Sequence, residues 1–131
     1  MKEPITFKAH DSYVIDIFFT PDSQCFVSAG MDNVVKLWAV PSWELLRTFK
    51  GHENSVNSMA LSPDGKTLGS GSSDQTLKLW SFPKGKLLHS LQDRKKIVVA
   101  VEFSPDGEWV ATGSYGGRAA VWNLAGEQVV G

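Results

Sequence analysis

One short pattern occurs three times in this chain, always at the same spacing. Residues 27–38 read VSAGMDNVVKLW, residues 69–80 read GSGSSDQTLKLW and residues 111–122 read ATGSYGGRAAVW. The spacing is 42 residues, and residues 10–51 match residues 52–93 at 12 of 42 positions without a gap. A fixed period of this size is the signature of a repeat architecture, in which each copy is one small unit that packs on its neighbours.

Each copy contains four short apolar segments separated by turns. In the first segment the apolar residues Val14, Ile17 and Phe19 are spaced by three and then by two, and the other copies repeat this spacing. Because a strand alternates with period two, the extra residue predicts a β-bulge. The turn that follows, Thr/Ser-Pro-Asp and then Gly or Ser, favours a left-handed residue, which is Ser23 in the first copy. No segment has a helical period, so the sequence predicts an all-β chain.

Four short strands in about 42 residues is the size of one blade of a β-propeller. We therefore expect three four-stranded antiparallel sheets, which together form a half or partial propeller in a single segment, residues 1–131. The expected divisions are a lone outer strand at 4–8, blade 1 at 10–50, blade 2 at 51–92, and blade 3 at 93–131 with a truncated last strand.

Gly51-His52 before the first strand of copy two, and the tryptophan that ends each third strand, complete a known pattern. With these residues the chain resembles the WD-repeat family. The resemblance covers almost the whole chain, although Trp38-Ala39, Trp80-Ser81 and Trp122-Asn123 all lack the aspartate that commonly follows the tryptophan.

The resemblance implies a structural hydrogen-bond relay in each intact copy. The relay residues are His10, Ser28, Asp32 and Trp38 in copy one, and His52, Ser70, Asp74 and Trp80 in copy two. Aspartate can accept from one ring nitrogen of histidine, and a serine hydroxyl can join the other ring nitrogen to the indole N–H. A catalytic Ser-His-Asp set is the alternative, but two sets that repeat at the structural period favour architecture.

Copy three departs from this relay. Arg94 stands where histidine is expected and Gly116 where aspartate is expected, while Thr112 and Trp122 remain. We therefore expect the third blade to be the least rigid, because a partly satisfied polar network is less stabilising than a complete one.

The resemblance also implies a non-enzymatic scaffold that binds proteins or peptides. In the family, the exposed positions are the residue before the relay aspartate and two residues around the bulge. In this chain the partner-binding candidates are Met31, Ser73, Tyr115, Tyr13, Ser55, Ile97, Ile15, Asn57 and Val99. Most are large and apolar, as residues that dominate interface energy are. The alternative for Ile15 and Val99 is that they only fill the bulge.

Two other function classes are less well supported. An enzyme would need catalytic or metal-binding groups, but no His or Cys pair has metal-ligand spacing, and GSGSSD lacks the final glycine and lysine of a phosphate loop. We expect no catalytic residue, cofactor or metal. A purely structural, self-assembling propeller module is the remaining alternative.

Three blades are too few to close a ring, since closed propellers have about four to eight. Both end faces would then be open, and exposed apolar patches usually mark an interface. The chain could form a homodimer that closes a six-bladed ring, with residues 4–8 as a clasp. It could equally be a fragment of a longer propeller, or a remnant that folds poorly.

Composition limits the partners further. Lys plus Arg (13) nearly balance Asp plus Glu (14), which argues against a nucleic-acid partner, because affinity for nucleic acid comes largely from neutralised phosphates. No run of apolar residues is long enough for a membrane helix or a signal peptide. Cys25 is the single cysteine, so we expect a soluble protein in a reducing, cytoplasmic compartment, with Cys25 as a packing residue.

Overall fold

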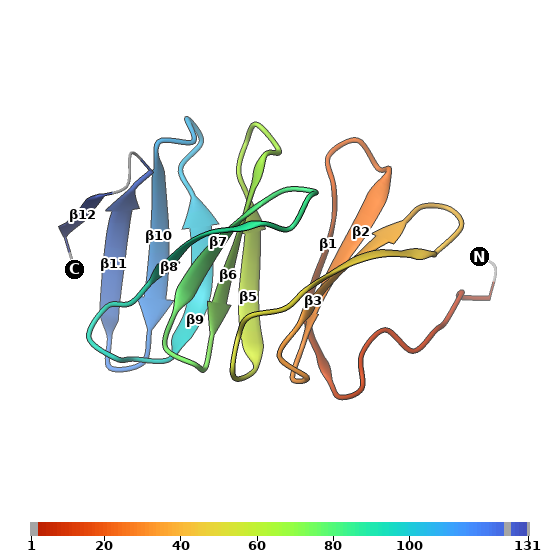
Figure 1. Ribbon diagram of the computed structural model, residues 1–131, viewed down its shortest axis with the longest axis horizontal. Coiled ribbons are helices and arrows are strands. Elements are labelled where there is room, and N and C mark those ends of the chain that lie inside the picture. Colours follow the sequence, from red (N-terminus) through yellow and green to blue (C-terminus); the bar gives the residue numbers. More distant parts are fainter. Residues whose placement is uncertain (1–2, 125–126, 131) are drawn as a thin grey trace.

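The computed structural model describes residues 3–124 and 127–130. These residues form three four-stranded antiparallel sheets and no helix, as expected, and the sheets stand side by side along the longest axis of the molecule (Figure 1). In blade 1 the strands are β1 (Val14–Phe19), β2 (Cys25–Gly30), β3 (Val35–Ala39) and β4 (Leu45–Phe49). In blade 2 they are β5 (Val56–Leu61), β6 (Thr67–Ser72), β7 (Leu77–Ser81) and β8 (Leu87–Leu91). In blade 3 they are β9 (Val98–Phe103), β10 (Trp109–Ser114), β11 (Arg118–Asn123) and β12 (Glu127–Val130).

The proline-containing turns close the first hairpin of each blade by the same contacts. In blade 1 the Thr20 hydroxyl donates to the Asp22 carboxylate over 2.6 Å, and the same carboxylate accepts the Gln24 N–H at 2.9 Å. Ser23 has φ 61°, whereas glycine fills this left-handed position in the other two blades. The predicted left-handed residue is therefore present at this turn, and because it is a serine it carries a modest strain.

The predicted β-bulges are also present. The pairing of β1 with β2 shifts between Val14 and Asp16, and β5 and β9 shift at the equivalent places. Ile15, Asn57 and Val99 are thus the extra residues. The side chains that follow each bulge change faces, which explains the spacing of three and then two in the sequence.

Two apolar cores lie between neighbouring blades. The first joins blade 1, through residues such as Val27, Ala29 and Leu37, to blade 2, through Val56, Met59 and Trp80. The second core joins blades 2 and 3 and contains Leu77, Leu79, Val98, Val101, Phe103, Val110, Ala120 and Trp122. Because successive side chains of a strand point to opposite faces, the middle sheet contributes one face to each core.

Residues 3–10 belong to none of the three sheets and have no strand assignment, so the strand predicted at 4–8 is not formed in the single chain. A strand needs hydrogen-bonding partners along a sheet edge, and β4 already completes the sheet of blade 1. The segment instead contacts blade 1 through the ring of Phe7, whose centroid lies 5.0 Å from the centroid of the Trp38 ring.

Candidate functional site

The buried polar residues of blade 1 form a continuous chain of hydrogen bonds. His10 Nδ1 donates to Asp32 Oδ1 over 2.9 Å, and His10 Nε2 lies 2.8 Å from Ser28 Oγ. Ser28 Oγ also accepts the Trp38 indole N–H over 3.0 Å. Because the indole can only donate, the serine oxygen must accept from it and send its own proton to His10 Nε2. The chain therefore connects the segment before β1 to both β2 and β3.

Blade 2 repeats this geometry with shorter distances. His52 Nδ1 lies 2.8 Å from Asp74, His52 Nε2 lies 2.7 Å from Ser70 Oγ, and Trp80 Nε1 donates to Ser70 Oγ over 2.8 Å. The Thr76 hydroxyl adds a further bond to Asp74 at 2.6 Å.

The protonation states of the blade 2 relay follow from this arrangement. Burial, together with the charge of Lys78, lowers the pKa of His52 more than the hydrogen bond and charge of Asp74 raise it, so the ring is neutral at pH 7. Burial raises the pKa of Asp74, but the hydrogen bonds from Thr76, His52 and the Glu53 N–H outweigh it and bring the pKa to about 2. The relay thus holds a neutral histidine beside an ionised carboxylate.

Blade 3 has only the end of the relay. Trp122 Nε1 lies 3.5 Å from Thr112 Oγ1, at the limit of a hydrogen bond, compared with 2.8 Å for the equivalent bond in blade 2. Arg94 is exposed, and Gly116 has φ 90° with no side chain to offer. The hydrogen bonds that connect the segment before the first strand to the second strand in blades 1 and 2 thus have no counterpart from Arg94 and Gly116 in blade 3.

The geometry of the two complete relays supports the architectural interpretation over a catalytic one. Ser28 and Ser70 have no exposed surface, and His10 and His52 are buried. A serine nucleophile needs a substrate carbon next to its oxygen, but here that oxygen is enclosed and already joined to histidine and tryptophan. No group of three or more His, Cys, Asp or Glu side chains among the described residues could hold a metal ion.

A rim of the molecule carries the partner-binding candidates in pairs. The Met31 N–H donates to the Tyr13 carbonyl, the Ser73 N–H to the Ser55 carbonyl, and the Tyr115 N–H to the Ile97 carbonyl, over distances of 2.9, 2.9 and 3.2 Å. Each blade therefore presents one pair of neighbouring residues at the same end of the hairpin formed by its first two strands. We call these six residues, with the bulge residues Ile15, Asn57 and Val99, the rim.

The rim is apolar at its two ends and polar in the middle. Tyr13 is 76% exposed and Tyr115 is 62% exposed, and Met31, Ile15 and Val99 are also exposed. The candidates in blade 2 are half-buried and polar: Ser55, Ser73 and Asn57. Asn57 Nδ2 donates to the Val98 carbonyl at 2.9 Å and to Ser73 Oγ at 3.0 Å, so its amide connects blade 2 to blade 3.

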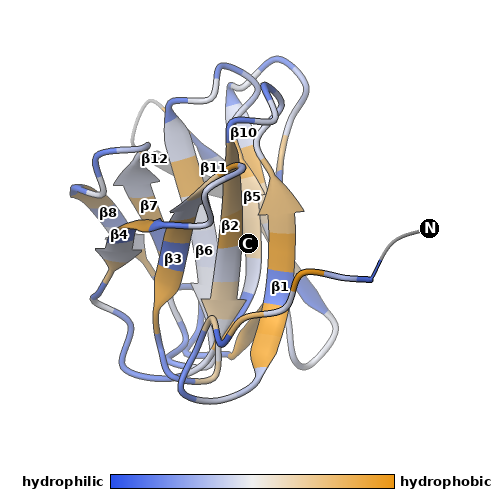
Figure 2. Ribbon diagram, turned by 90° about the vertical axis from the view of Figure 1, so that its right-hand side faces the viewer, coloured by the Kyte–Doolittle hydropathy of each residue, from blue (hydrophilic) through white to orange (hydrophobic). Residues whose placement is uncertain are grey.

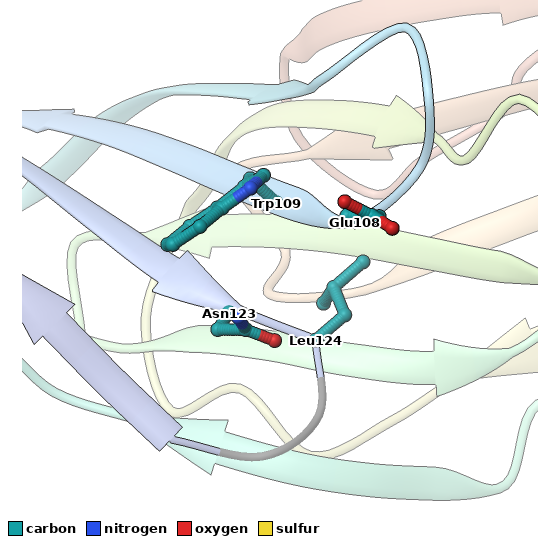
Figure 3. Close-up of a pocket in the computed structure, with 4 residues that line it drawn as sticks. All are labelled: Glu108, Trp109, Asn123 and Leu124. Atoms are coloured by element: carbon teal, nitrogen blue, oxygen red, sulfur yellow. The ribbon is translucent and has the colours of Figure 1, made fainter.

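The opposite end of the sheets carries hollows between the proline-containing turns. One hollow of 370 Å³ lies between blades 1 and 2 and includes Cys25, whose thiol pKa is raised by burial and then by nearby Asp22. At the free end of the molecule, a shallow hollow of 360 Å³ is lined by Glu108, Trp109, Asn123 and Leu124 (Figure 3). The Trp109 ring comes from β10 and Asn123 from the end of β11.

The sequence interpretation did not single out the contacts that join one blade to the next. The Met59 N–H donates to the Asp16 carboxylate at 2.9 Å, and the equivalent Val101 N–H donates to Ser58 Oγ at 3.2 Å. Asp16 and Ser58 are 42 residues apart, so the repeat register could have shown that a polar acceptor recurs at this position.

The model of the WD40 family, described as WD domain, G-beta repeat, matches residues 1–39, 43–81 and 85–123. The chain therefore belongs to the WD40 repeat family, whose domains are generally protein-interaction scaffolds. A search of curated proteins finds no significant match to any of them. Among the described residues, no helix is long and apolar enough to span a membrane.

Proposed function

We propose that this chain is a non-enzymatic protein-interaction scaffold that binds a protein or peptide segment on its rim. The observation that carries this proposal is the exposure of Tyr13 and Tyr115, two large side chains at equivalent ends of blades 1 and 3. Tyrosine is enriched at interfaces because its ring offers apolar area while its hydroxyl keeps a polar partner. Two apolar clusters around a polar centre fit an extended segment that carries an apolar anchor at each end.

We also propose that further blades complete the ring, either from a second copy of the chain or from blades of another polypeptide. The exposed apolar sheet face of blade 1 supports this part of the proposal. Val14, Ile17 and Phe19 are all exposed there. Figure 2, which looks onto this end, shows that most of the β1 ribbon has the colour of hydrophobic residues. A module that only assembles, with no ligand on its rim, is the second candidate, and the same exposed face favours it.

A binding experiment on the rim separates the two candidates. Peptides selected from a displayed library of random twelve-residue sequences on the wild-type protein should bind with measurable affinity. The double variant Tyr13→Ala and Tyr115→Ala should lose at least about tenfold in affinity, as expected for two interface anchors. Leu88→Ala, an exposed position on β8, should bind normally. Selection of no rim-dependent peptide would favour the purely assembling module.

A further inference from the structure

The two contacts between blades inside this chain define what a blade face accepts. We call the side of a blade that packs on the following blade its forward face, and the side that packs on the preceding blade its rear face. The rear face of blade 2 contains Val56, Met59 and Leu61, and the rear face of blade 3 contains Val98, Val101 and Phe103. Both are buried, apart from a half-buried Leu61.

The rear face of blade 1 has apolar side chains at the same register, but no blade of this chain covers it. Val14, Ile17 and Phe19 stand 42 residues before their buried counterparts, and they are 47, 55 and 58% exposed. Ile17 and Phe19 also follow the same bulge. This surface is therefore already shaped for the forward face of another blade.

The forward face of blade 2 shows which chemistry fits such a surface. Ideal Cβ atoms built on Gly71 and Gly69 would lie 2.5 Å from Val98 and 3.2 Å from Val101, so the absence of a side chain there makes room for the incoming valines. The equivalent positions in blade 3 are Gly113 and Ala111, followed on β11 by Ala119 and Val121. In blade 2, the glycines at these positions face the rear-face valines of blade 3. Blade 3 has small residues at the same positions of its own forward face.

We infer that the forward face of blade 3 docks on the rear face of blade 1 in a second copy of this chain. The inference rests on the proposed completion of the ring and names the chain that completes it. By register, Gly113 lies opposite Val14 of the second copy, and Ala111 lies opposite Ile17 and Phe19. Two copies supply six blades and make this head-to-tail contact twice, which closes a ring within the usual range of blade numbers.

Gly113 provides a sharp test, because its surroundings differ from those of Gly71. Among the described residues, a Cβ at Gly113 meets only Ala100 Cβ, at an ordinary 3.5 Å, and Gly113 is not among the glycines with positive φ. Valine at this position therefore fits the single chain and suits a strand. In the docked ring the same side chain would meet Val14 of the second copy, as a side chain at Gly71 would meet Val98.

The experiment measures molar mass by light scattering and sedimentation across a dilution series of the full chain. The wild-type protein is expected at 28.6 kDa, twice the 14.3 kDa of one chain. Gly113→Val should raise the dissociation constant at least about tenfold, as overpacking does, with an unchanged circular dichroism spectrum. His89→Val, on the exposed outer strand of the middle blade, is the matched control and should remain dimeric.

A compensating change strengthens the assignment. Val14→Ala in the Gly113→Val background removes the opposing methyl groups and should restore the dimer. A wild-type chain that stays monomeric at high concentration would overturn the inference, and so would a dimer that Gly113→Val leaves intact. Neither of these results would affect peptide binding at Tyr13 and Tyr115, so the rim function is tested separately.

Discussion

Phe7 and Trp38 reproduce a contact that is repeated one blade later. Their ring centroids are 5.0 Å apart, and Phe49 and Trp80, each 42 residues further along, are 5.7 Å apart. Phe49 is the last residue of β4 and packs from blade 1 onto blade 2. Phe7 therefore occupies on blade 1 the place that the outer strand of a preceding blade would fill, although residues 3–10 form no strand.

These two phenylalanines should differ in their effect on stability. Phe49 is 1% exposed and contacts both Trp80 and Phe82, whereas Phe7 is 41% exposed. We expect Phe49→Ala to lower the free energy of unfolding by about 3 to 4 kcal/mol, and Phe7→Ala by about 1 kcal/mol. Urea unfolding followed by tryptophan fluorescence measures both. Equal losses would contradict the interpretation of Phe7 as a half-exposed substitute for a missing strand.

The serine of the relay should be more important in blade 2 than the threonine of blade 3. Ser70→Ala leaves the buried Trp80 indole and one nitrogen of His52 without their partner, which should cost about 2 to 3 kcal/mol. Thr112→Val removes only a contact of 3.5 Å and should cost less than about 1 kcal/mol. Denaturant titration of the two variants decides the order. A larger loss for Thr112→Val would show that blade 3 has a polar network of comparable strength.

Acid should destabilise the chain through the relay of blade 2. The pKa of Asp74 falls from 3.8 to about 2 on folding, so its stabilisation is complete above pH 4 and is lost as the pH falls towards 2. The lowered pKa of His52 acts in the same direction, because the unfolded state takes up that proton first as the pH falls below 6.5. Both groups bind protons more weakly in the folded state, so stability rises with pH in these windows.

Asp74→Asn tests this linkage. The variant should be less stable than the wild type at pH 7, and its unfolding free energy should depend less on pH between 5 and 2. For this half-buried carboxylate we expect a difference of about 1 kcal/mol across that window, after allowance for screening by solvent. Thermal unfolding at a series of pH values measures it. An unchanged pH dependence would place the acid sensitivity in other carboxylates.

Much of this architecture follows from the sequence because it depends on local and periodic features. The proline-containing turns, the bulge at Ile15 and its equivalents, and the order of the strands all lie within one 42-residue period. The spacing of the relay residues is likewise constant, so one copy indicates the next. Period alone thus specifies each sheet, its turns and the residues that share a face.

Contacts between blades were harder to foresee, because alternation shows which residues share a face but not what covers that face. Asn57 is a partner-binding candidate by sequence, and the structure adds that its amide donates to the Val98 carbonyl of the next blade. Residues 4–8 likewise form no strand in the single chain, because their local pattern carries no information about whether a sheet edge is free. The rear face of blade 1 became identifiable only when its exposure could be compared with buried equivalents.

Glu102 should weaken the proposed contact between two copies, and its removal should strengthen it. This exposed residue of β9 occupies the position in blade 3 that Phe18 occupies in blade 1 and Ala60 in blade 2. Phe18 packs against the first core and Ala60 against the second. A carboxylate at this position must lose water when a second copy docks, whereas apolar side chains, Phe18 and Ala60, fill the same position in the two contacts between blades. Glu102→Ala, which gives blade 3 the residue of blade 2, should lower the dimer dissociation constant about tenfold.

Glu53→Ala, which removes an exposed carboxylate of blade 2, is the matched control and should leave the dimer dissociation constant unchanged. Sedimentation equilibrium measures both variants, and a weaker dimer for Glu102→Ala would mean that this face is not the one that docks.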